Sequence, residues 1–393
     1  MWWTALLSGL GAAWLLAGLN CWWNLKRVPA LPPADPAQAL PPVTVVVPAR
    51  NEAAGIGAAV RSLLAQDYPD FRVIVVDDGS TDATPRILAA LAAEHSRLTV
   101  LTGAPLPEGW LGKVWALHQG AERARAGGPP PVWLLFTDAD VHHAPETLRR
   151  AVTFAQARRA ALLSLIPHLT QGGFWERILI PGVLHFPYTL IPLSLATDPR
   201  APRVAVGGGA YNLVRTDAYQ AIGGHTGLKL AVVDDVTLAV RLKQAGQPLV
   251  AATAFPQVRV RMYHGFREFW DGFTKNTYVA LGNRVATAAA GILFSLAWQV
   301  LPFLALAGHL VAAGTGRGFG VAGWLAGTTV GIILATRVAC QRMTGDPLWP
   351  VLFHPLMGLV YTGIFLRSPY WTGMRRQVRW RGRTYHQDEF QAP

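Results

Sequence analysis

The 393-residue sequence has few charged residues and almost no cysteine. Only 15% of its residues are charged and 51% are hydrophobic, which is too apolar for an ordinary soluble enzyme. The two cysteines, Cys21 and Cys340, lie within or beside apolar segments, so they exclude a disulfide framework and a cysteine metal site. We therefore expect part of the chain to contact lipid.

Acidic residues are scarce as well, and the net charge is +12. Six arginines crowd the last 27 residues: Arg367, Arg375, Arg376, Arg379, Arg381 and Arg383. A basic tail beside an apolar segment predicts contact with anionic cytoplasmic lipid. Because no zinc-finger, helix-turn-helix or RNA-binding signature surrounds these arginines, the sequence argues against nucleic-acid binding.

The amino-terminal region is predicted to anchor the chain in a membrane. Residues 1–25 are apolar, long enough to cross a bilayer and followed by Lys26 and Arg27, which places their carboxyl end in the cytoplasm. Residues 26–42 are rich in proline and should form an extended linker. We expect a multi-pass protein of the inner (cytoplasmic) membrane whose catalytic domain faces the cytoplasm.

The carboxyl-terminal region, residues 286–367, contains three further apolar segments, followed by the basic cytoplasmic tail at 368–393. The apolar segments lie at about 292–311, 321–335 and 348–366. If the tail and the catalytic domain share one side of the membrane, an even number of crossings must separate them. One of the three segments is therefore expected to be re-entrant or interfacial.

Between the anchors, residues 43–265 alternate short β-branched runs with helical patterns. Strands are predicted at 43–47, 72–76, 98–101 and 132–136, and helices at 53–66, 84–93 and 113–126. This alternation predicts an α/β domain with a mostly parallel sheet and helices on both faces. Ligands of such sheets bind beyond the carboxyl ends of the strands, so the loops after these strands are the place to look for chemistry.

The first two predicted strands end in Pro48-Ala49-Arg50-Asn51-Glu52 and in Asp77-Asp78-Gly79-Ser80. Carboxylates there can accept hydrogen bonds from a nucleobase and from ribose, and the arginine offers a fork for phosphate. A turn that caps the next helix explains the Asp-Asp-Gly-Ser stretch equally well.

The strand at 132–136 leads into Asp138 and Asp140, two carboxylates separated by one residue. With donor phosphates, such a pair suits a hard divalent cation, Mg²⁺ or Mn²⁺, and Lys113 is a candidate helper at the leaving diphosphate. The adjacent His142 and His143 have no matching third ligand, so we expect surface histidines and not a zinc site.

Asp234 and Asp235 open a predicted helix that reaches Gln244. Acidic residues at a helix start can simply favour the helix dipole. Adjacent carboxylates in a partly buried pocket also raise one another's pKa, which suits one of them to act as a general base toward a hydroxyl.

Together these stretches resemble glycosyltransferase family 2, the inverting enzymes with a GT-A (Rossmann-like) fold. Five motifs occur in the family's order, at 47–52, 76–80, 137–140, 207–212 (Gly-Gly-Gly-Ala-Tyr-Asn) and 234–238. The stretches at 109–116 and 174–177 look most like membrane-bound hopene-associated and carotenoid glycosyltransferases. The resemblance implies transfer of a hexose from a nucleotide-diphosphate donor, with a UDP-sugar as the expected donor, to a lipid such as a hopanoid, a carotenoid or a ceramide-like lipid.

The resemblance also implies roles for individual residues. Donor binding falls to Pro48, Arg50, Glu52, Asp77, Asp78, Lys113 and Asp138, metal binding to Asp140 with Asp138, and catalysis to Asp235 as base beside Asp234. Acceptor binding falls to Gly208, Gly209 and Tyr211, and to Trp270 in an interfacial amphipathic region at 266–285.

Two other functions fit parts of the sequence. Arg376-Gln377-Val378-Arg379-Trp380 matches a motif of processive polysaccharide synthases, but here it follows the apolar segments instead of preceding them. An inactive membrane scaffold would keep the fold without turnover, although the carboxylates needed for metal, donor and base are all retained. A membrane contact through the basic tail is the favoured interpretation of the arginine motif.

Overall fold

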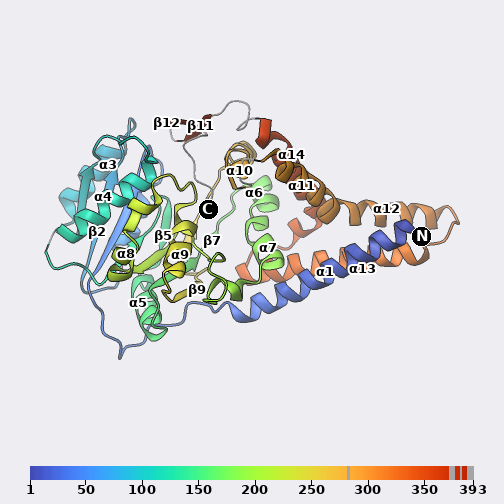
Figure 1. Cartoon of the computed structure of the whole chain (residues 1–393), viewed down its shortest axis with the longest axis horizontal. Helices are drawn as coiled ribbons and strands as arrows, with labels where there is room; N and C mark the ends of the chain where they lie inside the picture. The colour runs from blue at the N-terminus through green and yellow to red at the C-terminus, as the bar shows by residue number, and fades with distance from the viewer. Residues whose placement is uncertain (127, 281–283, 371–376, 381–382, 387–393) are drawn as a thin grey trace.

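The computed structural model describes residues 1–126, 128–280, 284–370, 377–380 and 383–386. An α/β domain forms one end of the molecule and a bundle of long helices forms the other, with shorter helices between them (Figure 1). The predicted fold class is confirmed.

The central sheet has seven strands in the order β3-β2-β1-β4-β8-β6-β9. Their bounds are β1 Val43–Ala49, β2 Phe71–Asp77, β3 Leu98–Thr102, β4 Trp133–Phe136, β6 Leu162–Ile166, β8 Asn212–Arg215 and β9 Leu249–Thr253. Only β8 runs antiparallel to its neighbours. The four predicted strands are all present, and each is parallel to the next across the sheet.

Helices cover both faces of this sheet: α2 Ile56–Leu64, α3 Thr84–Glu94, α4 Gly112–Ala126, α5 Thr147–Ala157, α8 Thr216–Ala221 and α9 Asp234–Gln244. The predicted helices are confirmed with ends shifted by up to three residues. Gly120 lets α4 lie close to β1, because a Cβ at this position would overlap Val46. Such close packing holds the start of α4 beside the strand ends.

A second, three-stranded sheet joins β5 (Val141–His143), β10 (Val258–Val260) and β7 (His168–Leu169). The proline-rich linker is docked on the domain and is not a free spacer: the Leu31 N–H donates to the Thr253 carbonyl, and the Thr253 N–H donates to the Pro29 carbonyl, both at 2.8 Å. The linker therefore fixes α1 (Trp2–Arg27) relative to the edge strand β9.

Four helical stretches among the described residues are long and apolar enough to cross a membrane: Trp2–Arg27, Ala286–Gly314, Gly320–Thr344 and Trp349–Ser368. The second contains α11 (Val285–Ser295), η3 (Leu296–Val300) and α12 (Leu301–Gly314); the third is α13, and the fourth contains η4 (Trp349–Phe353) and α14 (His354–Ser368). α1 packs along α13, and their thiols, Cys21 and Cys340, lie 3.8 Å apart. The sequence did not predict that contact.

The last apolar stretch keeps both ends near the α/β domain. At its start Trp349 stacks on Phe174 with ring centroids 5.7 Å apart. At its end Arg367 lies 3.6 Å from the carboxylate of Asp271. In contrast, the turn between α12 and α13 lies at the far end of the bundle, beside the amino terminus (Figure 1). The three carboxyl-terminal stretches are thus not equivalent.

Helices α6 (Phe174–Leu179), α7 (Pro181–Leu190) and α10 (Gly265–Ala280) lie between the domain and the bundle (Figure 1). α10 corresponds to the predicted interfacial region, whereas α6 and α7 were not predicted. Within the tail, Gln377–Trp380 forms β11 and pairs with β12 (Arg383–His386). Arg375, Arg376 and Arg381 lie outside the described residues.

Candidate active site

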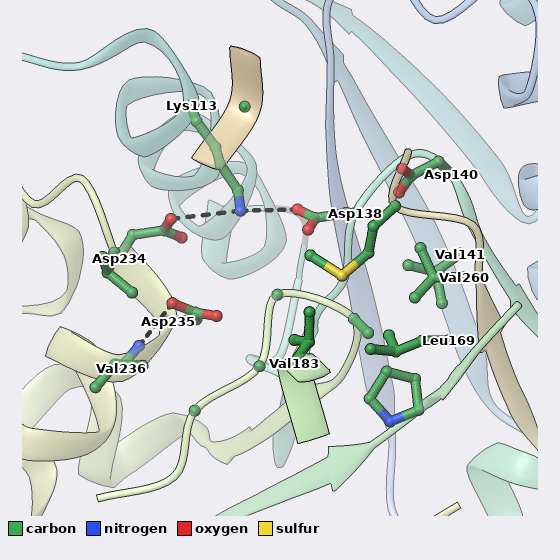
Figure 2. Close-up of a pocket in the computed structure, with 18 of the residues that line it drawn as sticks. Lys113, Asp138, Asp140, Val141, Leu169, Val183, Asp234, Asp235, Val236 and Val260 are labelled. Atoms are coloured by element: carbon green, nitrogen blue, oxygen red, sulfur yellow. Dashed lines mark hydrogen bonds and ion pairs between the residues drawn. The ribbon is translucent and has the colours of Figure 1, made fainter. Parts of the chain in front are cut away.

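A single cavity of about 2260 Å³ lies beyond the carboxyl ends of β1 and β4 and extends to α7 and α10. Small-molecule pockets usually measure about 300–1,000 Å³, so this cavity has room for more than a nucleotide sugar. Figure 2 shows its centre, where Lys113, Asp138, Asp234 and Asp235 converge and Asp140 lies to one side. The sequence-predicted carboxylates that follow β4 and those that open α9 are therefore brought together with Lys113.

The loops after β1 and β2 divide their predicted residues into two groups. Pro48, Glu52 and Asp78 line the cavity. Asp77 instead accepts hydrogen bonds from the backbone N–H and the hydroxyl of Ser80, so it caps the turn. Asp77 therefore stabilises the turn, as the alternative interpretation of this stretch predicted, whereas Asp78 lies where it can contact a ligand.

Arg50 also lines the cavity, but its guanidinium already has partners. It donates to the carbonyls of Asp78 and Gly79, the latter at 3.0 Å. These bonds hold the β2 loop against the β1 loop, so Arg50 braces the turn in this structure.

Lys113, at the start of α4, bridges two of the aspartate sites. Its ammonium lies 2.8 Å from Asp138 and 3.3 Å from Asp234 (Figure 2). Burial alone would lower the pKa of Lys113, but the neighbouring carboxylates outweigh burial and hold that pKa well above its usual value. Lys113 is therefore a fixed positive charge at the centre of the cavity.

Asp234 is nearly buried, with 9% of its side chain exposed. Burial raises its pKa to about 6, and the charge of Asp235 adds to the rise, although Lys113 opposes it. Asp235 accepts a hydrogen bond from the Val236 N–H at 2.8 Å, whereas the ion pairs of Lys113 in the part of the chain described are with Asp138 and Asp234. The two adjacent carboxylates thus have different surroundings.

Asp138 and Asp140 both line the cavity, as a metal site between protein and donor requires. Among the residues that the structure describes, no three His, Cys, Asp or Glu side chains lie close enough to hold a metal alone. Two carboxylates completed by substrate phosphates are nevertheless a usual ligand set for Mg²⁺. The residues present fit a cation that is held jointly with the donor.

Two glycines of the 207–209 run are needed at close approaches. A Cβ on Gly207 would overlap the backbone of Asp235, and one on Gly209 would overlap the Asp138 carboxylate. The Asp138 N–H also donates to the Gly209 carbonyl at 3.0 Å. These contacts, together with Gly208 in the cavity wall, join the second and third aspartate sites.

Two residues that were predicted to bind the acceptor lie away from the cavity. Tyr211 is fully buried beside His143, and Trp270 packs between Phe266 and α14, so neither lines the cavity. The prediction of surface histidines is confirmed for His142, which is exposed, and is wrong for His143, which is 5% exposed, because neighbouring side chains of β5 point to opposite faces. Its burial lowers its pKa to about 3.

The opposite side of the cavity is apolar and comes from α7, which sequence reasoning missed. Val183, Leu184 and Pro187 line it. Two asparagines of α1 hold the end of this helix: Asn24 donates to the carbonyls of Tyr188 and Ile191, both at 2.8 Å, and accepts from Leu193, while Asn20 donates to three carbonyls of the same segment. Pro192, just after α7, has no N–H to donate to the Tyr188 carbonyl, and the end of the helix leaves the other carbonyls without helical partners.

Glu176 of α6 joins the interfacial helices to the domain. It accepts two hydrogen bonds from Arg261, at 3.0 and 2.9 Å, and one each from the Gly172 and Gly265 N–H groups. Burial would raise the pKa of Glu176, but these bonds outweigh burial and lower it to about 2. This ion pair positions α6 and α10 beside the cavity.

Comparison with known proteins agrees with this architecture. Over 94% of this chain and 99% of the other, the fold matches a mannosyltransferase from Pyrobaculum calidifontis, solved in complex with GDP-Man and Mn²⁺, with a TM-score of 0.53 and 19% identity. The fold is therefore of the GT-A type, with apolar helices added to it.

Residues 44–223 match the family described as Glycosyl transferase family 2. The matched stretch runs from β1 to just past α8, so the first part of the α/β domain is similar to that family. The chain is also 29% identical to the 4,4'-diaponeurosporenoate glycosyltransferase of Staphylococcus aureus (strain USA300), over 87% of this chain and 88% of that protein.

Proposed function

We propose that this protein is a membrane-bound inverting glycosyltransferase that moves one hexose from a nucleotide-diphosphate donor, a UDP-hexose, to a lipid acceptor. The observation that carries the proposal is the single cavity, which joins a carboxylate centre at the strand ends to an apolar wall on α7. The similarity to a glycosyltransferase named for a carotenoid acid supports an isoprenoid acceptor of the same general kind.

The donor lies at the strand ends in this proposal. Pro48, Glu52 and Asp78 contact its nucleoside, and the Lys113 ammonium offsets charge on its diphosphate. A Mg²⁺ or Mn²⁺ ion held by Asp140 and Asp138 would supply further neutralisation of the leaving diphosphate.

Asp235 is the proposed base. An acceptor hydroxyl gives its proton to Asp235 while its oxygen bonds the anomeric carbon, and the bond from that carbon to the diphosphate oxygen breaks on the opposite face, inverting its configuration. Asp234 is the poorer base candidate because Lys113 engages it. An ionised carboxylate acceptor has no proton to give up. With such an acceptor, transfer would depend less on Asp235 as a base.

The acceptor approaches along α7 in this proposal. Val183, Leu184 and Pro187 offer it an apolar surface, and α7 itself rests on the carboxyl end of the anchor α1. A lipid can then present its polar end to Asp235 while its chain remains in the bilayer.

We also propose that α14 does not cross the membrane. Its stretch begins and ends near the α/β domain, whereas α12 leads away from the domain and α13 returns to it. Two crossings then separate the catalytic domain from the basic tail, which agrees with the even number required if both face the cytoplasm. Reporter fusions at the two termini should place them on opposite sides of the inner membrane.

Purified full-length protein incubated with labelled UDP-sugars and bacterial lipid extract tests the function. We expect one labelled glycolipid, dependent on Mg²⁺ or Mn²⁺, and a loss of about 10²-fold or more in Asp235→Asn if the acceptor is a hydroxyl. Asp217→Asn is the matched control, because Asp217 lies in the first turn of α8 and is exposed.

The remaining outcomes separate the other candidates. Long polymeric product would indicate a processive polysaccharide synthase. Absence of product together with no binding of UDP or Mn²⁺ would indicate an inactive scaffold. Unchanged lipid glycosylation in Asp235→Asn with a hydroxyl acceptor would refute the assigned base.

A further inference from the structure

A second charged site lies outside the catalytic cavity, within the helical bundle. Arg337 of α13 is 1% exposed, and none of its three guanidinium nitrogens has a hydrogen-bond partner among the residues that the structure describes. An arginine is always protonated, and burying its charge without a counter-charge costs several kcal/mol. Ionisable residues in apolar helices are also rare unless they serve a function.

Two imidazoles lie at the same junction of helices. The His185 ring of α7 is hydrogen-bonded at 3.0 Å to the hydroxyl of Thr336, the residue before Arg337, and the His354 ring of α14 lies next to His185. Their ring centroids are 5.7 Å apart, and each ring packs against Trp14 of α1 at 6.3 Å. Neither nitrogen of His354 is hydrogen-bonded in the described part of the chain, so it carries at least one unused N–H. We call Arg337, His185 and His354 the Arg337 cluster.

The chemistry of the cluster points to an anion. Arginine offers five N–H donors and no acceptor, and its planar fork fits carboxylate and phosphate oxygens. Gln299 and Gln341 present unpaired amide oxygens in the bundle, but a neutral amide does not balance a positive charge. Among the described residues, no acidic side chain is hydrogen-bonded to any nitrogen of the Arg337 guanidinium.

The position of the cluster suits a lipid headgroup. Arg337 lies seven residues before Thr344, the end of α13 nearest the catalytic domain. At 1.5 Å per residue it is therefore only about 10 Å inside that end of the helix. Basic pockets between membrane helices on the cytoplasmic side are known to bind anionic headgroups.

We propose that the Arg337 cluster binds the oxyanion of a membrane lipid, a phosphate or a carboxylate, at the junction of α7, α13 and α14. The bound lipid would neutralise the buried guanidinium and tie α7, whose other residues line the catalytic cavity, to the two bundle helices. This site is separate from the donor and acceptor positions.

Thermal unfolding of the delipidated full-length protein in neutral detergent tests the proposal. The probes are phosphatidylglycerol for phosphate, oleate for carboxylate and phosphatidylcholine as the zwitterionic reference. We expect one of the anionic probes to raise the unfolding midpoint by about 3 °C or more over phosphatidylcholine. The probe that succeeds identifies the source of the oxyanion.

Arg337→Met should abolish this rise, because it removes the charge while keeping an apolar chain of similar length. Arg342→Gln, an exposed arginine on the same helix, should retain it and controls for general attraction of anionic lipid to a basic protein. Equal responses of Arg337→Met and wild type, or no response of wild type to either probe, would overturn the site.

If Arg337→Met does not accumulate, lipids retained by wild type through purification decide the matter by mass spectrometry. About one anionic lipid per chain supports the site, and a retained mixture that matches the bulk membrane contradicts it. Neither readout uses glycosyl transfer, so their failure would leave the proposed function standing.

Discussion

Two cations of this chain, the partly buried Lys113 and the fully buried Arg337, lie in opposite surroundings. Lys113, in the catalytic cavity, contacts two carboxylates within 3.3 Å. Arg337, in the helical bundle, contacts no carboxylate among the described residues. Both positive charges carry a desolvation cost, but only the first is offset by the chain itself.

The two halves of the molecule differ in what balances the charge of the cation. In the catalytic half the charge balance is internal, so the cation can hold the aspartate sites in place before any substrate binds. In the bundle the balance must come from a ligand in the surroundings, so the cation can sense or retain a lipid. Removing each cation should therefore have different consequences.

The largest effect is expected from Lys113→Met. Asp138 and Asp234 would lose the charge that lies between them, and charge on the leaving diphosphate would be less well stabilised. We expect kcat/KM for transfer to fall by about 10²–10³-fold, the usual size for loss of one such electrostatic group. Steady-state kinetics with saturating metal measures it.

Lys229→Met is the matched control, since Lys229 is exposed and lies over the Trp110 ring near the same cavity. Its activity should stay within a few-fold of wild type. If kcat/KM of Lys113→Met equals that of wild type, the positive charge between Asp138 and Asp234 is not needed for catalysis.

A smaller effect, on stability, is expected from Asp234→Asn. Because the folded-state pKa of about 6 exceeds the ordinary value of 3.8, ionisation of Asp234 costs stability as pH rises through 6. The free energy of unfolding of the variant should exceed that of wild type by about 3 kcal/mol at pH 8 and by little at pH 4. Thermal unfolding in EDTA without donor measures this difference.

Glu108→Gln, at an exposed carboxylate, should not show this pH-dependent gain. A gain for Asp234→Asn that is equal at both pH values would contradict the assigned pKa.

A smaller effect is expected from Asn24→Ala in the bundle half, which should lower the free energy of unfolding by about 1–2 kcal/mol. The buried Asn24 amide satisfies carbonyls at the end of α7, so its loss should loosen the apolar wall. KM for the lipid should rise while KM for the donor stays constant.

Asn20→Ala provides a graded comparison, because it leaves the Asn24 bonds in place and should have the milder effect. An equal rise in both KM values would show that Asn24 acts on the whole fold and not on the acceptor wall.

The smallest effect is expected from joining Cys21 to Cys340. With the thiols 3.8 Å apart, mild oxidation should protect both from maleimide labelling after denaturation. Activity should not change, because α1 and α13 already pack together. Full labelling of both thiols after oxidation would contradict the packing of these two helices.

Much of the α/β domain was predictable from sequence because its strands are buried on both faces. Val43 to Val47 and Arg72 to Val76 give nearly continuous β-branched runs, and glycine and proline mark their ends. The antiparallel strand β8 and helices α6 and α7 were not predictable, since their positions depend on contacts with distant elements.

The site was predictable at the level of its loops but not of each side chain. Sequence adjacency could not separate Asp77 from Asp78, because the turn rotates one toward Ser80 and the other toward the cavity. Tyr211 and Trp270 were chosen from their places in the sequence pattern. In the structure Tyr211 packs against His143 and Trp270 packs against α14, so neither lines the cavity. The Arg337 cluster joins three helices and has no local signature.

The configuration and size of the product test the central claim most directly. Full-length protein should convert UDP-α-glucose, or the UDP-hexose that it accepts, and a bacterial lipid into a glycolipid with one sugar in β linkage, as NMR spectroscopy of the purified product would show. An α-linked product, or a chain of sugars, would contradict single inverting transfer at Asp235.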